Sequence, residues 1–200
     1  MHVVLRITRD VGRLRRRRAY HAFRRALITS LGRSDFRVVH ISIQRHHVHL
    51  LVEADDRMAL SRGVRGLSIS AARRLNEAIT IDRRLARPRR GRVFTDRYHA
   101  TAIATPTQAR SALAYVLNNW RHHREHRGGG LHGARVDPYS SAVAFPGWAG
   151  RGGVPFAWPR GYEPLPVAYP TLWLLTIGWR RGGPPVPLDG VPGQRRATRL

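Results

Sequence analysis

The segment that decides the fold is 36-FRVVHISIQRHHVHLLV-52. Its two ends, Phe36 to Ile43 and Val48 to Val52, are rich in Val and Ile and are typical of strands. The residues between them, Gln44-Arg45-His46, have the length of a hairpin connection. We therefore expect two antiparallel neighbouring strands, with several histidines beside their turn.

The segments on both sides of this hairpin alternate between strand and helix patterns. His2 to Thr8 predicts a strand, and Val93 to Ile103 predicts another that is broken by Asp96-Arg97. A last helix begins at Pro106, with Thr105 as its N-cap. Two earlier helices are indicated by apolar residues at helical spacing, which are Tyr20, Phe23, Leu27 and Leu31, and then Leu60, Val64, Leu67, Ala71, Leu75 and Ala78. The order β-α-β-β-α-β-α predicts an α+β fold of the ferredoxin-like (split βαβ) type, one antiparallel sheet with helices on one face.

Composition divides the chain into two parts. Residues 128–200 contain 14 of the 19 Gly, 11 of the 13 Pro and four of the five Trp. Residues 1–127 contain 28 of the 36 arginines. We therefore expect a regular basic domain over residues 1–127, a boundary near Gly128-Gly129-Gly130, and an irregular C-terminal extension over residues 128–200.

The charge of the chain indicates a polyanion partner. There are 36 basic residues against 12 acidic ones, a net charge of +24, and every basic residue other than histidine is arginine. Codon bias explains arginine in place of lysine, whereas selection for bidentate phosphate contacts would explain both the residue type and the excess. Residues 1–127 carry 28 arginines against nine acidic residues, so the excess charge is concentrated there.

Targeting signals and cysteines are absent from the sequence. There is no cysteine, hence no disulfide framework and no cysteine-based zinc site. The N-terminus does not resemble a signal peptide, and the most apolar segment, Leu172 to Trp179, is too short to cross a bilayer. We therefore expect a soluble cytoplasmic or nucleoid-associated protein with no membrane partner.

A histidine pair lies in the third predicted strand. Because side chains alternate along a strand, His47 and His49 project from one face while Val48 points into the core. Two imidazoles at this separation can share one metal ion. The alternative is that both histidines are structural.

A tyrosine of the last helix lies away from the apolar side of that helix. The apolar stripe consists of Ala109, Leu113, Val116, Leu117 and Trp120. Tyr115 falls instead on the polar side, with Asn119 one turn further along. Either Tyr115 is a surface residue beside an amide, or it is a nucleophile beside a ligand oxygen.

Three sequence motifs, taken together and in their order along the chain, resemble those of a known protein family. They are RHHVHLLVE (45–53), GRVFTDRYH (91–99) and AYVLNN (114–119). Taken together they resemble the single-tyrosine HUH transposases, which are the IS200-like insertion-sequence transposases and the REP-associated tyrosine transposases. The resemblance covers roughly residues 1–127, and none of the motifs would carry it alone.

What this resemblance implies is a ferredoxin-like domain that cuts and rejoins single-stranded DNA at hairpin or palindromic elements. Tyr115 would be the nucleophile and would form a 5′-phosphotyrosine, while His47, His49 and Asn119 would bind Mg²⁺ or Mn²⁺. The residue types suit this chemistry, since a phosphodiester needs a nucleophile and a cation against its oxygens. A phenolate leaves more readily than an alkoxide, so the bond to tyrosine can be reversed without water or an energy source.

The sequence departs from the family pattern in two places. His46 stands where the family usually has Asn or Asp, and it should point away from His47 and His49. The extension after Gly128 does not match the insertion-sequence members and is more like one found in single-copy, domesticated relatives. Whether the protein is a monomer or a homodimer, and whether it is mobile, stays open.

Further nucleic-acid contacts are expected from two runs of arginines, and the tryptophans of the extension are candidates for others. Arg15, Arg16, Arg17 and Arg18 precede the first helix, where positive charge opposes the helix dipole, so we expect phosphate contacts there. Arg89, Arg90 and Arg92 flank the fourth strand and have the same expected role. The tryptophans of the extension either pack it against the catalytic domain or stack on unpaired bases.

Two other functions compete with strand transfer. The first is an inactive or domesticated nucleic-acid-binding module with the same fold. The second is a small-molecule phosphoesterase or nucleotide hydrolase, but its HxHxH pattern would need a histidine where Leu51 stands. The sequence therefore favours a metal-dependent transposase, with the binding module as the alternative.

Overall fold

The structure is a computed structural model that describes residues 1–95, 97–122, 136–149 and 160–191. Its strands are β1 (His2–Arg6), β2 (Phe36–Ile43), β3 (His47–Ala54) and β4 (His99–Thr101). Its helices are α1 (Arg17–Ser30), α2 (Arg57–Asp82), α3 (Pro106–His122) and α4 (Trp173–Thr176), with short 3₁₀ turns at η1 (Arg9–Val11), η3 (Ser141–Ala144) and η4 (Gly178–Gly182). Through α3 the order is the predicted β-α-β-β-α-β-α, which confirms the α+β class.

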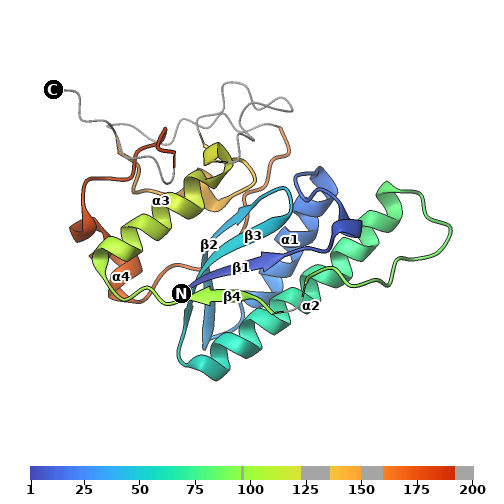
Figure 1. The fold of residues 1–200 in the computed structure, drawn as a ribbon, viewed down its shortest axis with the longest axis horizontal. Coiled ribbons are helices and arrows are strands. Elements are labelled where there is room, and N and C mark those ends of the chain that lie inside the picture. Colours follow the sequence, from blue (N-terminus) through green and yellow to red (C-terminus); the bar gives the residue numbers. More distant parts are fainter. Residues whose placement is uncertain (96, 123–135, 150–159, 192–200) are drawn as a thin grey trace.

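The four strands form one antiparallel sheet in the order β2-β3-β1-β4 (Figure 1). The predicted hairpin is the pair β2–β3, and β1 lies between β3 and β4. The fourth strand is shorter than the predicted region 93–103, because only His99–Thr101 pair with β1, while Phe94 makes an isolated bridge to Ile7. The register places Val4 of β1 between His49 and His99.

One face of the sheet is covered by α1 and α2. The core on this face includes Val48 of β3, Phe23 of α1 and Leu67 of α2, all of them buried. The predicted alternation in β3 is confirmed, because Val48, Leu50 and Val52 point into this core. The prediction of helices on one face therefore holds for α1 and α2.

The opposite face is covered by α3. Its apolar stripe packs on Val39 of β2 and Leu51 of β3, in a second core of its own. The first turn of α3 is capped as predicted, since the Thr105 hydroxyl accepts a hydrogen bond from the Gln108 amide at 3.2 Å. Parts of the extension complete this core through Val136, Ala142, Val143, Phe145, Leu175, Trp179 and Val186.

Two buried carboxylates hold the extension against the N-terminal domain. Glu53 at the end of β3 accepts hydrogen bonds from the Thr171 amide and hydroxyl, at 2.8 and 2.9 Å, and from the Leu172 amide at 3.0 Å. Asp137 pairs with Arg15, with side chains 0% and 7% exposed. The extension is therefore anchored at both ends of the sheet's hairpin.

Two of the extension's tryptophans pack as expected. Trp179 is buried, and the Trp148 indole donates a hydrogen bond to the Ala142 carbonyl at 3.0 Å. Trp173 is 45% exposed, while Trp158 and the predicted boundary at Gly128–Gly130 lie outside the described residues. In the described ranges, no helix combines the length and the apolar character that a bilayer span requires.

Candidate active site on the α3 face of the sheet

The two motif histidines lie on the sheet face that α3 covers. His49 is 3% exposed and His47 is half-buried. Their ring centroids are 4.6 Å apart and the rings are perpendicular. The predicted pair of imidazoles on one face is thus present, on the side opposite the Val48 core.

Tyr115 of α3 lies against His49, one member of this pair. Its ring is edge-on to the His49 ring, with centroids 5.2 Å apart and planes at 86°. The side chain is half-buried, so it is neither a core tyrosine nor a fully exposed one. The structure therefore brings the predicted tyrosine close to the predicted histidines. Tyr115 and His49 are 66 residues apart in the sequence.

Asn119 lies one helical turn beyond Tyr115. Its side chain is fully buried. Within the ranges that the structure describes, neither its Oδ1 nor its Nδ2 has a hydrogen-bond partner. Buried amides are nearly always hydrogen-bonded, so Asn119 is an exception, which it shares in part with the Oδ1 of the neighbouring Asn118.

A histidine that sequence reasoning missed completes the cluster. Nε2 of His2, in β1, is 3.0 Å from Nδ1 of His49, and the two rings stack with centroids 5.2 Å apart. The His2 ring also meets Tyr115 edge-on at 5.7 Å. Burial lowers the pKa of His2 below its ordinary value. Alternation along β1 puts His2 opposite to the buried Val3, but only the register with β3 reveals its neighbours.

The residue types present, two imidazoles and a carboxamide, would suit a divalent cation with mixed nitrogen and oxygen ligands. Over the described residues, no group of three or more His, Cys, Asp or Glu is arranged to hold a metal. A site here would therefore consist of His47, His49 and the carboxamide oxygen of Asn119. Imidazole nitrogens suit Mn²⁺ better than Mg²⁺, and the amide oxygen suits both.

The sheet next to this cluster offers exposed polar side chains. Arg6 pairs with His47 across β1 and β3, and His99 and Thr101 follow on β4. Paired residues share one face, so these three side chains lie beside the histidines. All three are exposed, because α3 packs over β2 and β3.

The arginines predicted to contact phosphate fall into two groups. Arg15 is buried in its ion pair with Asp137 and also donates to the Ile43 carbonyl, so it has a structural role. Arg89 is similarly occupied, since it pairs with Asp10 and is 9% exposed. Arg18 is exposed but pairs with Asp82 at 2.6 Å. The exposed members include Arg16, Arg17, Arg90 and Arg92.

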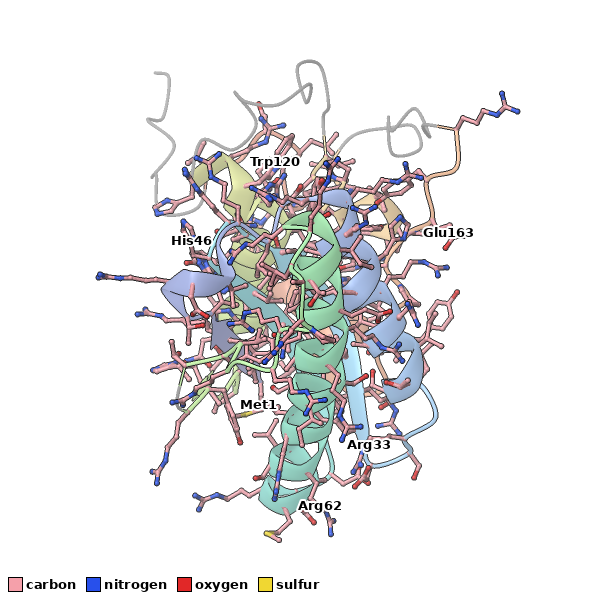
Figure 2. The ribbon with its side chains drawn as sticks, turned by 90° about the vertical axis from the view of Figure 1, so that its right-hand side faces the viewer. Met1, Arg33, His46, Arg62, Trp120 and Glu163 are labelled. Atoms are coloured by element: carbon pink, nitrogen blue, oxygen red, sulfur yellow. The ribbon has the colours of Figure 1, made fainter. Side chains whose placement is uncertain are left out.

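His46 lies outside β3, in the turn. It is exposed, and its Nδ1 is 3.3 Å from the Gly12 carbonyl oxygen. Figure 2 shows His46 and Trp120 in the upper part of the molecule, while Arg62 near the start of α2 lies at the lower end. The residue that departs from the family pattern is therefore a turn residue.

Comparison with known families gives one match. The family model described as transposase IS200 like matches residues 1–119, more than half of the chain. The chain belongs to the IS200-like transposase family. Neither the curated proteins nor the solved structures contain a match to it. In this IS200-like transposase the matched region ends at Asn119, so it includes all four residues of the cluster that the sequence predicted and excludes the extension.

Proposed function

We propose that this IS200-like transposase cleaves and rejoins single-stranded DNA with Tyr115 as its nucleophile. The observation that supports this most directly is the Tyr115 ring against His49, with the unsatisfied amide of Asn119 one turn away. A surface tyrosine would have no reason to be held against two histidines on a sheet. The family membership supports a DNA substrate.

The chemistry follows from the residues present. The Tyr115 oxygen attacks a phosphorus of the strand, the bond from that phosphorus to the 3′ oxygen breaks, and the 3′ oxygen departs as a hydroxyl. A 5′-phosphotyrosine links the protein to the DNA, and attack by a 3′-hydroxyl reverses the step and restores the tyrosine. A divalent cation held by His47, His49 and Asn119 would supply positive charge against the phosphate oxygens.

The surroundings of Tyr115 suit a single strand. The exposed side chains of Arg6, His99 and Thr101 border the histidines on the uncovered part of the sheet. Arg6 supplies positive charge there, and the two others supply hydrogen bonds. Unpaired DNA could cross β1 and β4 at this place and present a phosphate to Tyr115, whereas α3 closes the other side of the site.

The test is a covalent adduct assay on single-stranded hairpin DNA with Mg²⁺ or Mn²⁺. Wild-type protein should form an adduct that survives denaturing gel electrophoresis, and Tyr115→Phe should form none while it binds the same DNA with the wild-type Kd. Tyr98→Phe is a matched control, since Tyr98 is a half-buried tyrosine of the same domain outside the cluster, and it should keep the adduct. An unchanged adduct in Tyr115→Phe would refute the assignment, and no adduct from wild type on any such substrate would favour a nucleic-acid-binding module.

A further inference from the structure

His2 touches both a proposed metal ligand and the proposed nucleophile, and the function proposed above gives it no role. Its Nε2 is 3.0 Å from Nδ1 of His49, and the two rings stack at 24°. The same ring meets Tyr115 edge-on, with ring centroids 5.7 Å apart. One side chain of β1 therefore links a residue of β3 to a residue of α3.

The hydrogen bond determines how His49 can bind a cation. A neutral imidazole carries one N–H and one acceptor nitrogen. Because Nδ1 of His49 is engaged with His2, the nitrogen that can bind a metal is Nε2. With Nε2 on a cation, His49 would carry its proton on Nδ1 and donate it to Nε2 of His2. Metal-binding histidines usually make such a bond to a carboxylate or carbonyl, and here an imidazole would be the acceptor.

The position of His2 is fixed by the backbone on both sides. In β1 it pairs with Leu51 of β3 and with Thr101 of β4, so it lies in the middle of the sheet. Next to it, the Val52 amide donates to the Met1 carbonyl at 2.9 Å. Figure 1 shows β1 between these two strands. A ring on such a rigid element can hold a neighbouring ring in one orientation.

We propose that His2 is a positioning residue of the candidate active site, which accepts the Nδ1 proton of His49 and thereby directs Nε2 of His49 to the cation. The same ring keeps Tyr115 beside His49. This inference rests on the proposed function, and it names the residue that sets the geometry of that site.

Two variants of His2 test its hydrogen-bond acceptor and its aromatic ring separately. His2→Gln puts a carbonyl oxygen near the place of Nε2, so it keeps the acceptor and loses the ring. His2→Phe keeps a ring of similar size and loses the acceptor. Both are made in the full chain, and circular dichroism with thermal unfolding establishes that each is folded.

Two measurements that need no DNA test whether His2 positions His49. Electron paramagnetic resonance of unbound Mn²⁺ reports the metal affinity, and ¹⁵N NMR of the imidazoles in metal-free protein reports the His49 tautomer. We expect His2→Gln to bind Mn²⁺ nearly as well as wild type and to keep the Nδ1–H tautomer. His2→Phe should bind about 10- to 100-fold more weakly, which is the usual effect of losing such a partner, and should show a mixture of tautomers.

Three results would overturn the proposal. They are an Nε2–H tautomer of His49 in the wild type, wild-type Mn²⁺ affinity in His2→Phe, and a His2→Gln variant as weak as His2→Phe. The first needs no variant, so it decides the matter even if a substitution prevents folding. A wild-type protein that binds Mn²⁺ but forms no DNA adduct contradicts the proposed function alone, since neither measurement depends on cleavage.

Discussion

At the scale of single residues, two neighbouring buried asparagines of α3 differ in the hydrogen bond of Nδ2, while the Oδ1 of each has no partner among the described residues. Asn118 is 1% exposed, and its Nδ2 donates to the Pro187 carbonyl of the extension at 2.9 Å. Asn119 is fully buried, and its amide has no hydrogen-bond partner among the residues described. A buried polar group left unsatisfied costs about 1–3 kcal/mol, and a bound cation would remove this cost for the Oδ1 of Asn119.

The two asparagines therefore predict opposite effects of the same substitution. Asn118→Ala should lower the free energy of unfolding by about 1 kcal/mol, because it removes a buried hydrogen bond, and should leave Mn²⁺ affinity unchanged. Asn119→Ala should weaken Mn²⁺ binding at least tenfold, with little loss of stability in metal-free protein. Urea denaturation and Mn²⁺ titration measure both quantities. Equal Mn²⁺ affinity in the two variants would exclude Asn119 as a ligand.

The sequence predicts those features of the site that depend on local periodicity, and it misses those that depend on contacts between residues far apart in the chain. His47, His49 and Tyr115 follow from the local periods of a strand and a helix, and the ring contact between Tyr115 and His49 agrees with them. His2 was missed because its place depends on the register of β1 with β3. Arg15 was expected to contact phosphate because it precedes a helix in a run of arginines. Its partner, Asp137, lies 122 residues away in the sequence, so the local pattern could not reveal the ion pair.

At the scale of elements, α2 approaches β2 closely at one glycine. A Cβ placed on Gly63 would collide with the ring of Phe36, which is itself fully buried. Gly66, less than a turn further along the same helix, has nothing within 4 Å of the place where its Cβ would be. The pattern of apolar residues predicted α2 but could not distinguish these two glycines, because the difference depends on a side chain of another element.

Substitution of each glycine by alanine should therefore change stability in opposite directions. Gly63→Ala should lower the free energy of unfolding by about 1–3 kcal/mol, because the overpacked ring of Phe36 must move. Gly66→Ala should raise it by up to about 1 kcal/mol, since alanine is the better helix former and the site is open. Urea denaturation of both variants measures the two changes. A destabilised Gly66→Ala would show that helix propensity does not decide stability at this position.

At the scale of the whole molecule, the fold places exposed arginines near the β2–β3 turn. The Leu14 amide donates to the Arg45 carbonyl at 2.9 Å, so the start of α1 lies against the β2–β3 turn that precedes His47. Arg16 and Arg17 follow at this end of the molecule, exposed and with no ion pair to any described residue. Arg62 is also exposed, but Figure 2 places it at the end away from His46.

This distribution predicts a position-dependent salt effect on DNA binding. Each phosphate contact on single-stranded DNA contributes about 0.7 to the slope of log K against log salt concentration. The double variant Arg16→Ala with Arg17→Ala should therefore reduce that slope by up to about 1.4 and weaken binding at low salt. Arg62→Ala removes one charge at the far end and should leave the slope unchanged. Fluorescence anisotropy with a labelled hairpin, over a range of salt concentrations, measures all three proteins. Equal slopes in the double variant and wild type would mean that the arginines at the start of α1 are a solvated surface, and that the DNA is held elsewhere on this basic domain.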